Sequence, residues 1–174
     1  MNAVNRVVAT PEEMHRLGRE VAAVLRAGDV VVLTGDLGAG KTTLARGLGA
    51  GLSVIGAVTS PTFVIARTHP RADHLAPLVH VDAYRLSDPR ELDDLDIDFA
   101  GSIVVVEWGK DMVEPLAPQR LEIDIDRRRG ERAGTLATSG VSADAGSQSE
   151  MDSDAEPRVV TIRSVGERWT GVTW

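Results

Sequence analysis

The chain has 174 residues, a formal net charge of −7, 43% hydrophobic residues and no cysteine. This length supports one domain with a hydrophobic core and is too short for two ordinary domains. The composition excludes disulfides and thiolate metal sites, and no apolar run approaches the roughly 20 residues that span a bilayer. Together with the lack of a charged-then-apolar signal segment, this leads us to expect a cytoplasmic protein without a membrane partner.

The negative charge is concentrated in residues 130–157, which carry −5, so the rest of the chain carries only −2. Gly, Ser, Ala, Asp and Glu dominate this segment, and burial of its few large apolar side chains cannot offset the entropy lost on ordering. We therefore predict a disordered acidic insertion within a single domain formed by residues 1–129 and 158–174. Since that domain has no basic surplus, RNA is expected to be held indirectly, through a partner.

The predicted elements begin with a helix whose capping signals are Thr10, Pro11 and Glu13 and which Gly28 is expected to stop. Apolar runs then predict strands, and the run at 103–106 is continuously apolar, as in a strand covered on both faces. Strands that alternate with helices predict an α/β, P-loop NTPase-like three-layer fold with a mostly parallel central sheet. The strands are expected at 30–34, 63–68, 78–82, 103–107, 121–126 and 159–163, and further helices at 42–51 and 89–95.

Residues 35–42 read Gly-Asp-Leu-Gly-Ala-Gly-Lys-Thr, which is the G-x-x-x-x-G-K-[ST] phosphate-binding pattern between a predicted strand and a predicted helix. The glycines allow the backbone N–H groups to approach phosphates, and the following helix contributes its positive dipole end. Lys41 is expected to reach the β- and γ-phosphates, and the Thr42 hydroxyl to bind Mg²⁺. The predicted loop residues are Gly35, Asp36, Leu37, Gly38, Ala39, Gly40, Lys41, Thr42 and Thr43.

Two carboxylates end apolar strands, namely Asp82 and Glu107, where a parallel sheet would bring them beside the loop. We interpret both as metal-orienting or catalytic groups, although an acid at a strand end is also common as a solvated turn residue. Glu107 either holds Mg²⁺ through water or orients the attacking water, and the spacing does not separate these roles. Thr62 occupies the position of a switch threonine, with ordinary turn chemistry as the alternative.

Other chemistry-bearing residues are interpreted as structural. The imidazole of His80 is expected to pack inside a strand and that of His69 to be exposed. The arginines at 127–129 either supply charge stabilisation or end a strand in solvent. Trp108 either packs in the core or forms a contact surface.

In combination these motifs resemble the TsaE family (older name YjeE) over residues 7–126, and more weakly over 158–171. The motifs that carry the resemblance lie, in order, at 17–18, 35–43, 60–63, 80–86, 88–92 and 106–108. The resemblance implies a slow ATPase that binds ATP and Mg²⁺ and acts with TsaD, a transferase, and TsaB, its scaffold. It implies a role in threonylcarbamoylation of the adenosine beside the anticodon in tRNAs that read codons beginning with A, where hydrolysis resets the complex between turnovers.

The resemblance also assigns roles to residues of this sequence. Lys41, Thr42 and Thr43 match phosphate and metal residues, Thr62 matches the switch-like threonine, and Asp82 matches the strand-end aspartate. Glu107 matches the acid tied to Mg²⁺ and hydrolysis, Trp108 a tryptophan important for activity, and Pro11 the segment near adenine. This sequence departs from the family at Ala83, where leucine is usual. It departs again at the insertion, which leaves open whether Arg132 or Arg158 approaches the base.

A small-molecule kinase is the main alternative, because the same loop opens kinase folds and the arginines at 127–129 could belong to a lid. The acidic segment that follows them argues against a lid. A nucleotide-sensing adaptor that hydrolyses negligible ATP is a further alternative. Recognition of GTP is not expected, since the sequence lacks an N-K-x-D base-reading motif.

Overall fold

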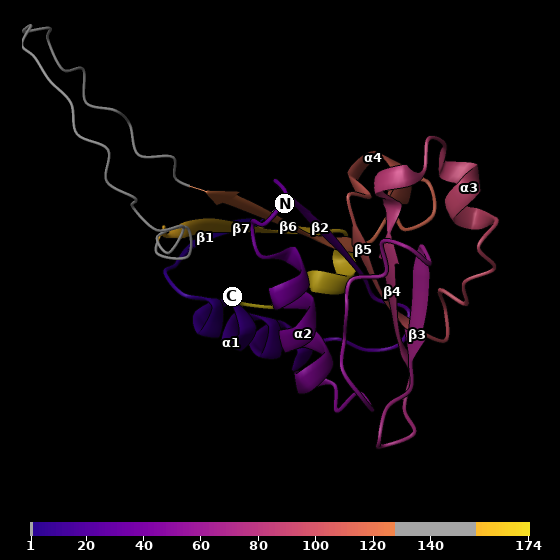
Figure 1. Ribbon diagram of the computed structural model, residues 1–174, viewed down its shortest axis with the longest axis horizontal. Coiled ribbons are helices and arrows are strands. Elements are labelled where there is room, and N and C mark those ends of the chain that lie inside the picture. The colour runs from indigo at the N-terminus through magenta and orange to yellow at the C-terminus, as the bar shows by residue number, and fades with distance from the viewer. Residues whose placement is uncertain (1, 128–155) are drawn as a thin grey trace, which may run out of the picture.

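The computed structural model describes residues 2–127 and 156–174, and its elements are labelled in Figure 1. Residues 130–155 of the expected insertion, including Arg132, lie outside the described residues. In chain order the elements are β1 (Asn2–Val8), α1 (Pro11–Ala22), β2 (Val30–Gly35), α2 (Lys41–Gly51), β3 (Ala66–His69), β4 (Leu78–Asp82), η1 (Ala83–Arg85), α3 (Pro89–Asp93), β5 (Ile103–Glu107), α4 (Lys110–Val113), β6 (Arg120–Arg127), β7 (Arg158–Val165) and η2 (Glu167–Trp169).

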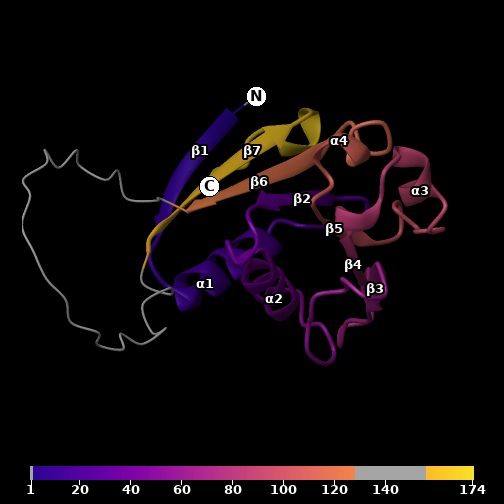
Figure 2. The same ribbon diagram turned by 45° about the horizontal axis from the view of Figure 1, so that its top comes forward.

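The strands form one seven-stranded sheet in the order β1-β7-β6-β2-β5-β4-β3, which Figure 2 shows as a continuous twisted surface. The four central strands β6, β2, β5 and β4 are parallel to one another, whereas β7 is antiparallel to β6 and β1, and β3 is antiparallel to β4. The sheet is therefore mixed and mostly parallel, which confirms the predicted α/β class. Among the described residues, no helix is long and apolar enough to cross a membrane.

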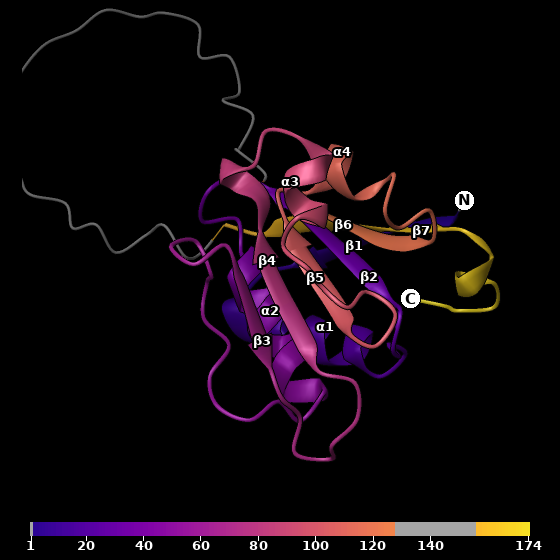
Figure 3. The ribbon, with the colours of Figure 1, turned by 90° about the vertical axis from the view of Figure 1, so that its right-hand side faces the viewer.

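Alternation along the central strands supplies both hydrophobic cores. Val31 and Leu33 of β2 face α1 and α2, whereas Val30 and Val32 face α3 and α4. The strand β5 divides its side chains in the same way, and all five are buried. Helices thus cover the sheet on both faces, and Figures 1 and 3 show α1 and α2 on the opposite side from α3 and α4. The result is a three-layer arrangement.

Helices α1 and α2 pack against each other at two glycines. A Cβ built on Gly18 would lie 2.4 Å from the carbonyl oxygen of Leu44 and 2.8 Å from the Cα of Gly47. A Cβ on Gly47 would lie 2.1 Å from the carbonyl oxygen of His15. Only glycine permits this approach, so the contact fixes the position of α2, whose first turn begins the candidate phosphate site.

The predicted helix start is confirmed: the Glu13 amide donates to Thr10 Oγ1 and Glu13 Oε2 accepts from the Ala9 amide. The helix ends at Ala22, earlier than the stop expected at Gly28. The P-loop helix begins at Lys41, one residue before the predicted start.

Further differences from the sequence-based expectations concern a strand start, two elements and one histidine. The strand expected at 63–68 starts only at Ala66, because Ile65 has a left-handed φ of 67° and donates its N–H to the Pro61 carbonyl in a turn. The edge strand β1 and the short α4 were not predicted at all. His69 is buried rather than exposed, with 5% of its surface accessible.

We expect Gly18→Ala to lower the free energy of unfolding by about 1–3 kcal/mol, because its methyl group overpacks the contact between α1 and α2. Urea denaturation followed by circular dichroism measures this change. Arg16→Ala, an exposed substitution in the same helix, should change it by less than about 0.5 kcal/mol. Equal stabilities of Gly18→Ala and wild type would contradict the tight helix contact.

Candidate functional site

The predicted phosphate loop connects the end of β2 to the start of α2. Gly35 and Gly40 have left-handed φ values of 150° and 116°, and a Cβ on Gly35 would lie 2.5 Å from the carbonyl oxygen of Ile125. Ala39 is fully buried beneath the loop, whereas Leu37 is 89% exposed at its tip. The loop therefore offers backbone N–H groups around an open concavity, beside the first turn of α2.

Lys41 is held within this loop. Its Nζ donates to the carbonyl oxygens of Gly35 at 2.7 Å and Asp36 at 3.1 Å, and lies 4.0 Å from the centroid of the Trp108 ring. Burial lowers the pKa of the Lys41 amino group, and the charges of Glu107 and Asp82 oppose this shift. The Lys41 amino group is therefore a desolvated donor next to two acids.

Asp82 and Glu107 stand side by side, because they are register partners at the carboxyl ends of the parallel strands β4 and β5. Both are buried, with 6% and 3% of their surfaces exposed. The Thr42 hydroxyl donates to Glu107 Oε1 across 3.3 Å, which links the second strand-end acid to the first turn of α2. Two carboxylates and a hydroxyl supply the oxygen donors that Mg²⁺ prefers, and such sites are completed by substrate phosphates and water. The residues present thus fit the expected ion.

Asp82 also organises the loop that precedes β3. Its Oδ2 accepts the Thr62 hydroxyl at 2.7 Å, its Oδ1 accepts the Tyr84 amide at 3.1 Å, and its own amide donates to the Ile65 carbonyl at 2.8 Å. The Ser60 hydroxyl lies 2.7 Å from that of Thr62. Thr62, the predicted switch threonine, therefore donates a hydrogen bond to Asp82, one of the two predicted metal-orienting acids.

Trp108 follows Glu107 in a left-handed conformation, with φ of 63°, and its backbone N–H donates to the Leu33 carbonyl at 3.0 Å. Such a conformation is costly for a bulky residue and persists only where the surroundings impose it. Besides Lys41, the indole contacts the ring of Tyr84 edge-on, with centroids 5.5 Å apart. The partly buried ring is therefore neither a core residue nor a free surface residue, but part of the wall around Lys41.

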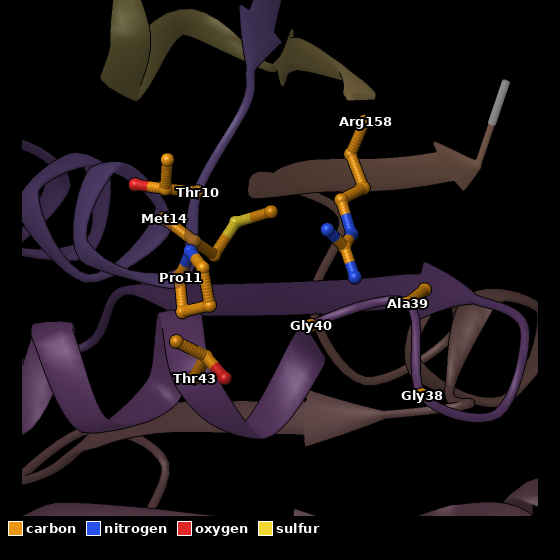
Figure 4. Close-up of a pocket in the computed structure, with 8 residues that line it drawn as sticks. All are labelled: Thr10, Pro11, Met14, Gly38, Ala39, Gly40, Thr43 and Arg158. Atoms are coloured by element: carbon orange, nitrogen blue, oxygen red, sulfur yellow. The ribbon is translucent and has the colours of Figure 1, made fainter. Parts of the chain in front are cut away.

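A small pocket of about 90 Å³ opens between the loop, α1 and β7, on the side of the loop away from Asp82 and Glu107 (Figure 4). The Arg158 side chain points from β7 toward the loop, opposite Pro11 and Met14 of α1. The volume is well below the roughly 300–1,000 Å³ of an enclosed ligand pocket, so it accommodates only part of a nucleotide. Its lining residues are Thr10, Pro11, Met14, Gly38, Ala39, Gly40, Thr43 and Arg158.

The structure thus brings the predicted site residues into one region, with the pocket near Pro11 on the β6–β7 side of the loop and the acids on the β5–β4 side.

Two residues that sequence reasoning interpreted as structural also reach the site. The Arg127 guanidinium donates to the Gly38 carbonyl, and His80 Nε2 lies 2.9 Å from Glu107 Oε1. Alternation along 78–82 could have found His80, since it places that ring on the same face as Asp82. For Arg127, the sequence had offered charge stabilisation as one of two alternatives, but not a contact with the loop.

The sequence matches the model of the family described as "Threonylcarbamoyl adenosine biosynthesis protein TsaE" over residues 8–134. The chain belongs to the TsaE family. A relative from Streptomyces coelicolor, named tRNA threonylcarbamoyladenosine biosynthesis protein TsaE, is 52% identical over 159 residues, which cover 90% of this chain and 93% of the relative. The TsaE protein of Bacillus subtilis is 42% identical and is matched over 67% of this chain and 73% of its own length.

The crystal structure of Bacillus subtilis YdiB has a TM-score of 0.66 and 31% identity, and the match covers 97% of this chain and 89% of that chain. The structural neighbour therefore agrees with the P-loop-like fold. The family places this TsaE chain in the biosynthesis of threonylcarbamoyladenosine in tRNA.

We expect Thr62→Val to increase amide hydrogen exchange across residues 61–66, because it removes the hydroxyl that ties this loop to Asp82. A hydrogen bond to a charged group contributes about 1.5–3 kcal/mol, so local opening should become at least roughly tenfold more frequent. Ser60→Ala is the matched control, since Ser60 contacts Thr62 but not the carboxylate. Equal exchange in both variants would show that the Thr62–Asp82 bond does not order the loop.

Proposed function

We propose that this TsaE protein is a Mg²⁺-dependent ATPase required for threonylcarbamoylation of the adenosine next to the anticodon in tRNAs that read codons beginning with A. The observation that carries the proposal is the grouping of Lys41, Thr42, Asp82 and Glu107 at the start of α2. A P-loop ATPase requires these parts: a lysine for the phosphates, a hydroxyl for the metal and carboxylates around the γ-phosphate.

Each group has a defined task in this proposal. The amides of the P-loop and the ammonium of Lys41 bind the phosphate oxygens and stabilise the charge that develops on them. Thr42, Asp82 and Glu107 hold the divalent ion, which neutralises phosphate charge when bound. Glu107 is also placed to orient the attacking water, since it faces the same region from the end of β5. Thr62, held by Asp82, reports the γ-phosphate to the loop at 60–65.

The adenine end of ATP is assigned to the side where Arg158 and Pro11 face each other. Arg158 lines that pocket, which supports its contact with the base. A guanidinium can stack on an aromatic ring or donate hydrogen bonds to its acceptors. The 90 Å³ of the pocket agrees with a role for one part of the nucleotide only.

A TsaD-like transferase and a TsaB-like scaffold are the proposed partners, and the proposal places the protein in the cytoplasm, where tRNA is modified. Family membership supports this pathway, and the charge of −2 outside 130–157 supports contact with tRNA only through the complex. A small-molecule kinase is less well supported. The pocket at the P-loop lies on the β7 side of β2, whereas Asp82 and Glu107 lie on the β5–β4 side. A kinase substrate bound in this pocket would therefore not have its acceptor hydroxyl beside the two acids.

Purified protein is expected to hydrolyse ATP in a Mg²⁺-dependent manner, and Lys41→Ala or Glu107→Ala should lower the rate at least roughly tenfold, as for loss of one group that stabilises transition-state charge. Phosphate release measures the rate. Glu114→Ala removes a carboxylate that is 71% exposed and should leave the rate unchanged. A wild-type rate equal to that of Glu107→Ala, with the partner proteins present, would refute the ATPase assignment.

Reconstitution tests the pathway separately. The protein is combined with TsaB-like and TsaD-like proteins, tRNA, ATP and threonylcarbamoyl-adenylate, and modified tRNA is counted over several turnovers. We expect modification to stop near one turnover per complex when this chain is omitted, because hydrolysis is proposed to reset the complex. Unchanged multiple-turnover modification without the chain would exclude this role.

A further inference from the structure

His80 is a fully buried imidazole in the middle of β4, with 0% of its surface exposed. Side chains of a strand alternate between faces, so His80 shares the face of Leu78 and Asp82, toward α2. In the same way Glu107 shares the face of Ile103 and Val105 on β5. Because both side chains lie on the same face of the sheet, on the neighbouring strands β4 and β5, His80 Nε2 lies 2.9 Å from Glu107 Oε1.

The direction of this hydrogen bond follows from its partners. A carboxylate only accepts, so His80 Nε2 carries the hydrogen and donates. His80 Nδ1 is buried without a hydrogen-bond partner among the described residues. A hydrogen on Nδ1 would be an unpartnered buried donor, which is costly, so the hydrogen on Nε2 fits this environment.

Glu107 uses the two oxygens of its carboxylate differently. Oε1 accepts from His80 and from the Thr42 hydroxyl, at 2.9 and 3.3 Å. No hydrogen bond joins Oε2 to another residue in the described part of the chain, so this oxygen remains available at the end of β5. His80 and Thr42 approach from different elements, β4 and α2, and together they restrict rotation of the Glu107 side chain.

We propose that His80 is a positioning residue for Glu107, fixing its carboxylate so that Oε2 faces the nucleotide and its ion. The inference rests on the proposed ATPase function. Partners of this kind orient a metal-linked carboxylate, and their loss costs about 10–100-fold in affinity or activity. A displacement of about 1 Å in a reacting group has an effect of similar size.

The test compares three variants of the full chain. His80→Phe keeps a buried ring but removes the donor, and should lower kcat for ATP about 10–100-fold while KM changes less than about threefold. His80→Gln places an amide donor near the position of Nε2 and should recover at least roughly a third of the wild-type kcat. His69→Gln is the matched control, because His69 is also a buried histidine of this sheet, and no hydrogen bond links it to Glu107.

A double-mutant cycle with Glu107→Gln shows whether His80 acts through Glu107. We expect His80→Phe to cause no further loss of kcat in the Glu107→Gln background, since the group that it positions is already changed. Calorimetry supplies a readout independent of turnover. In His80→Phe, affinity for ADP without Mg²⁺ should equal that of wild type, and the gain in affinity on adding Mg²⁺ should be smaller.

The outcomes separate the two proposals. Absence of ATP hydrolysis by wild type, alone and with its partners, overturns the ATPase function itself. Hydrolysis by wild type together with independent, multiplicative effects of His80→Phe and Glu107→Gln overturns only the positioning role. The same conclusion follows if His80→Gln does not recover activity although its thermal unfolding matches wild type. If His80→Phe fails to fold, the positioning role is decided by comparing the kcat of His80→Gln with that of wild type, and by the calorimetric measurement on His80→Gln.

Discussion

The parallel register of β4 and β5 puts Asp82 next to Glu107, and the candidate site depends on this pairing. Two neighbouring buried carboxylates repel each other, and each loses hydration on folding. The structure offsets that cost with donors from several elements: Thr62 and the Tyr84 amide for Asp82, and Thr42 and His80 for Glu107. Lys41 adds a positive charge nearby. In the proposed function, a bound cation would complete this compensation.

The Lys41 side chain is held in place by its neighbours. The ammonium donates to two carbonyl oxygens of the loop and lies against the indole of Trp108. In the proposed function, a phosphate would replace these partners instead of ordering a free side chain. The left-handed backbone of Trp108 lies directly after Glu107 and is anchored to β2 through the Leu33 carbonyl. Strain of this kind is concentrated at functional sites because the surrounding fold maintains it.

Sequence alone was sufficient for the elements whose signals are local. Central strands such as β2 and β5 are continuous apolar runs because both of their faces are covered, and the P-loop has its own residue spacing. By contrast, Asn5 and Arg6 interrupt the apolar sequence of β1, and pairing with β7 holds this segment as an edge strand. The contacts of His80 with Glu107 and of Arg127 with Gly38 join residues far apart in the chain. Alternation along β4 indicates which face His80 occupies, but it does not identify Glu107 as its partner.

The position of β1 at one edge has a consequence for the order in which the molecule is made. Val4 pairs with Ile162, so β1 has its partner only after the whole of the sheet's other strands has been synthesised. Until then its unpaired edge stays open to other chains, the hazard that exposed strands carry during slow, non-local folding. The pairs that β2 forms with β5 and β6 need only residues up to 127, so these contacts become available before β1 has its partner.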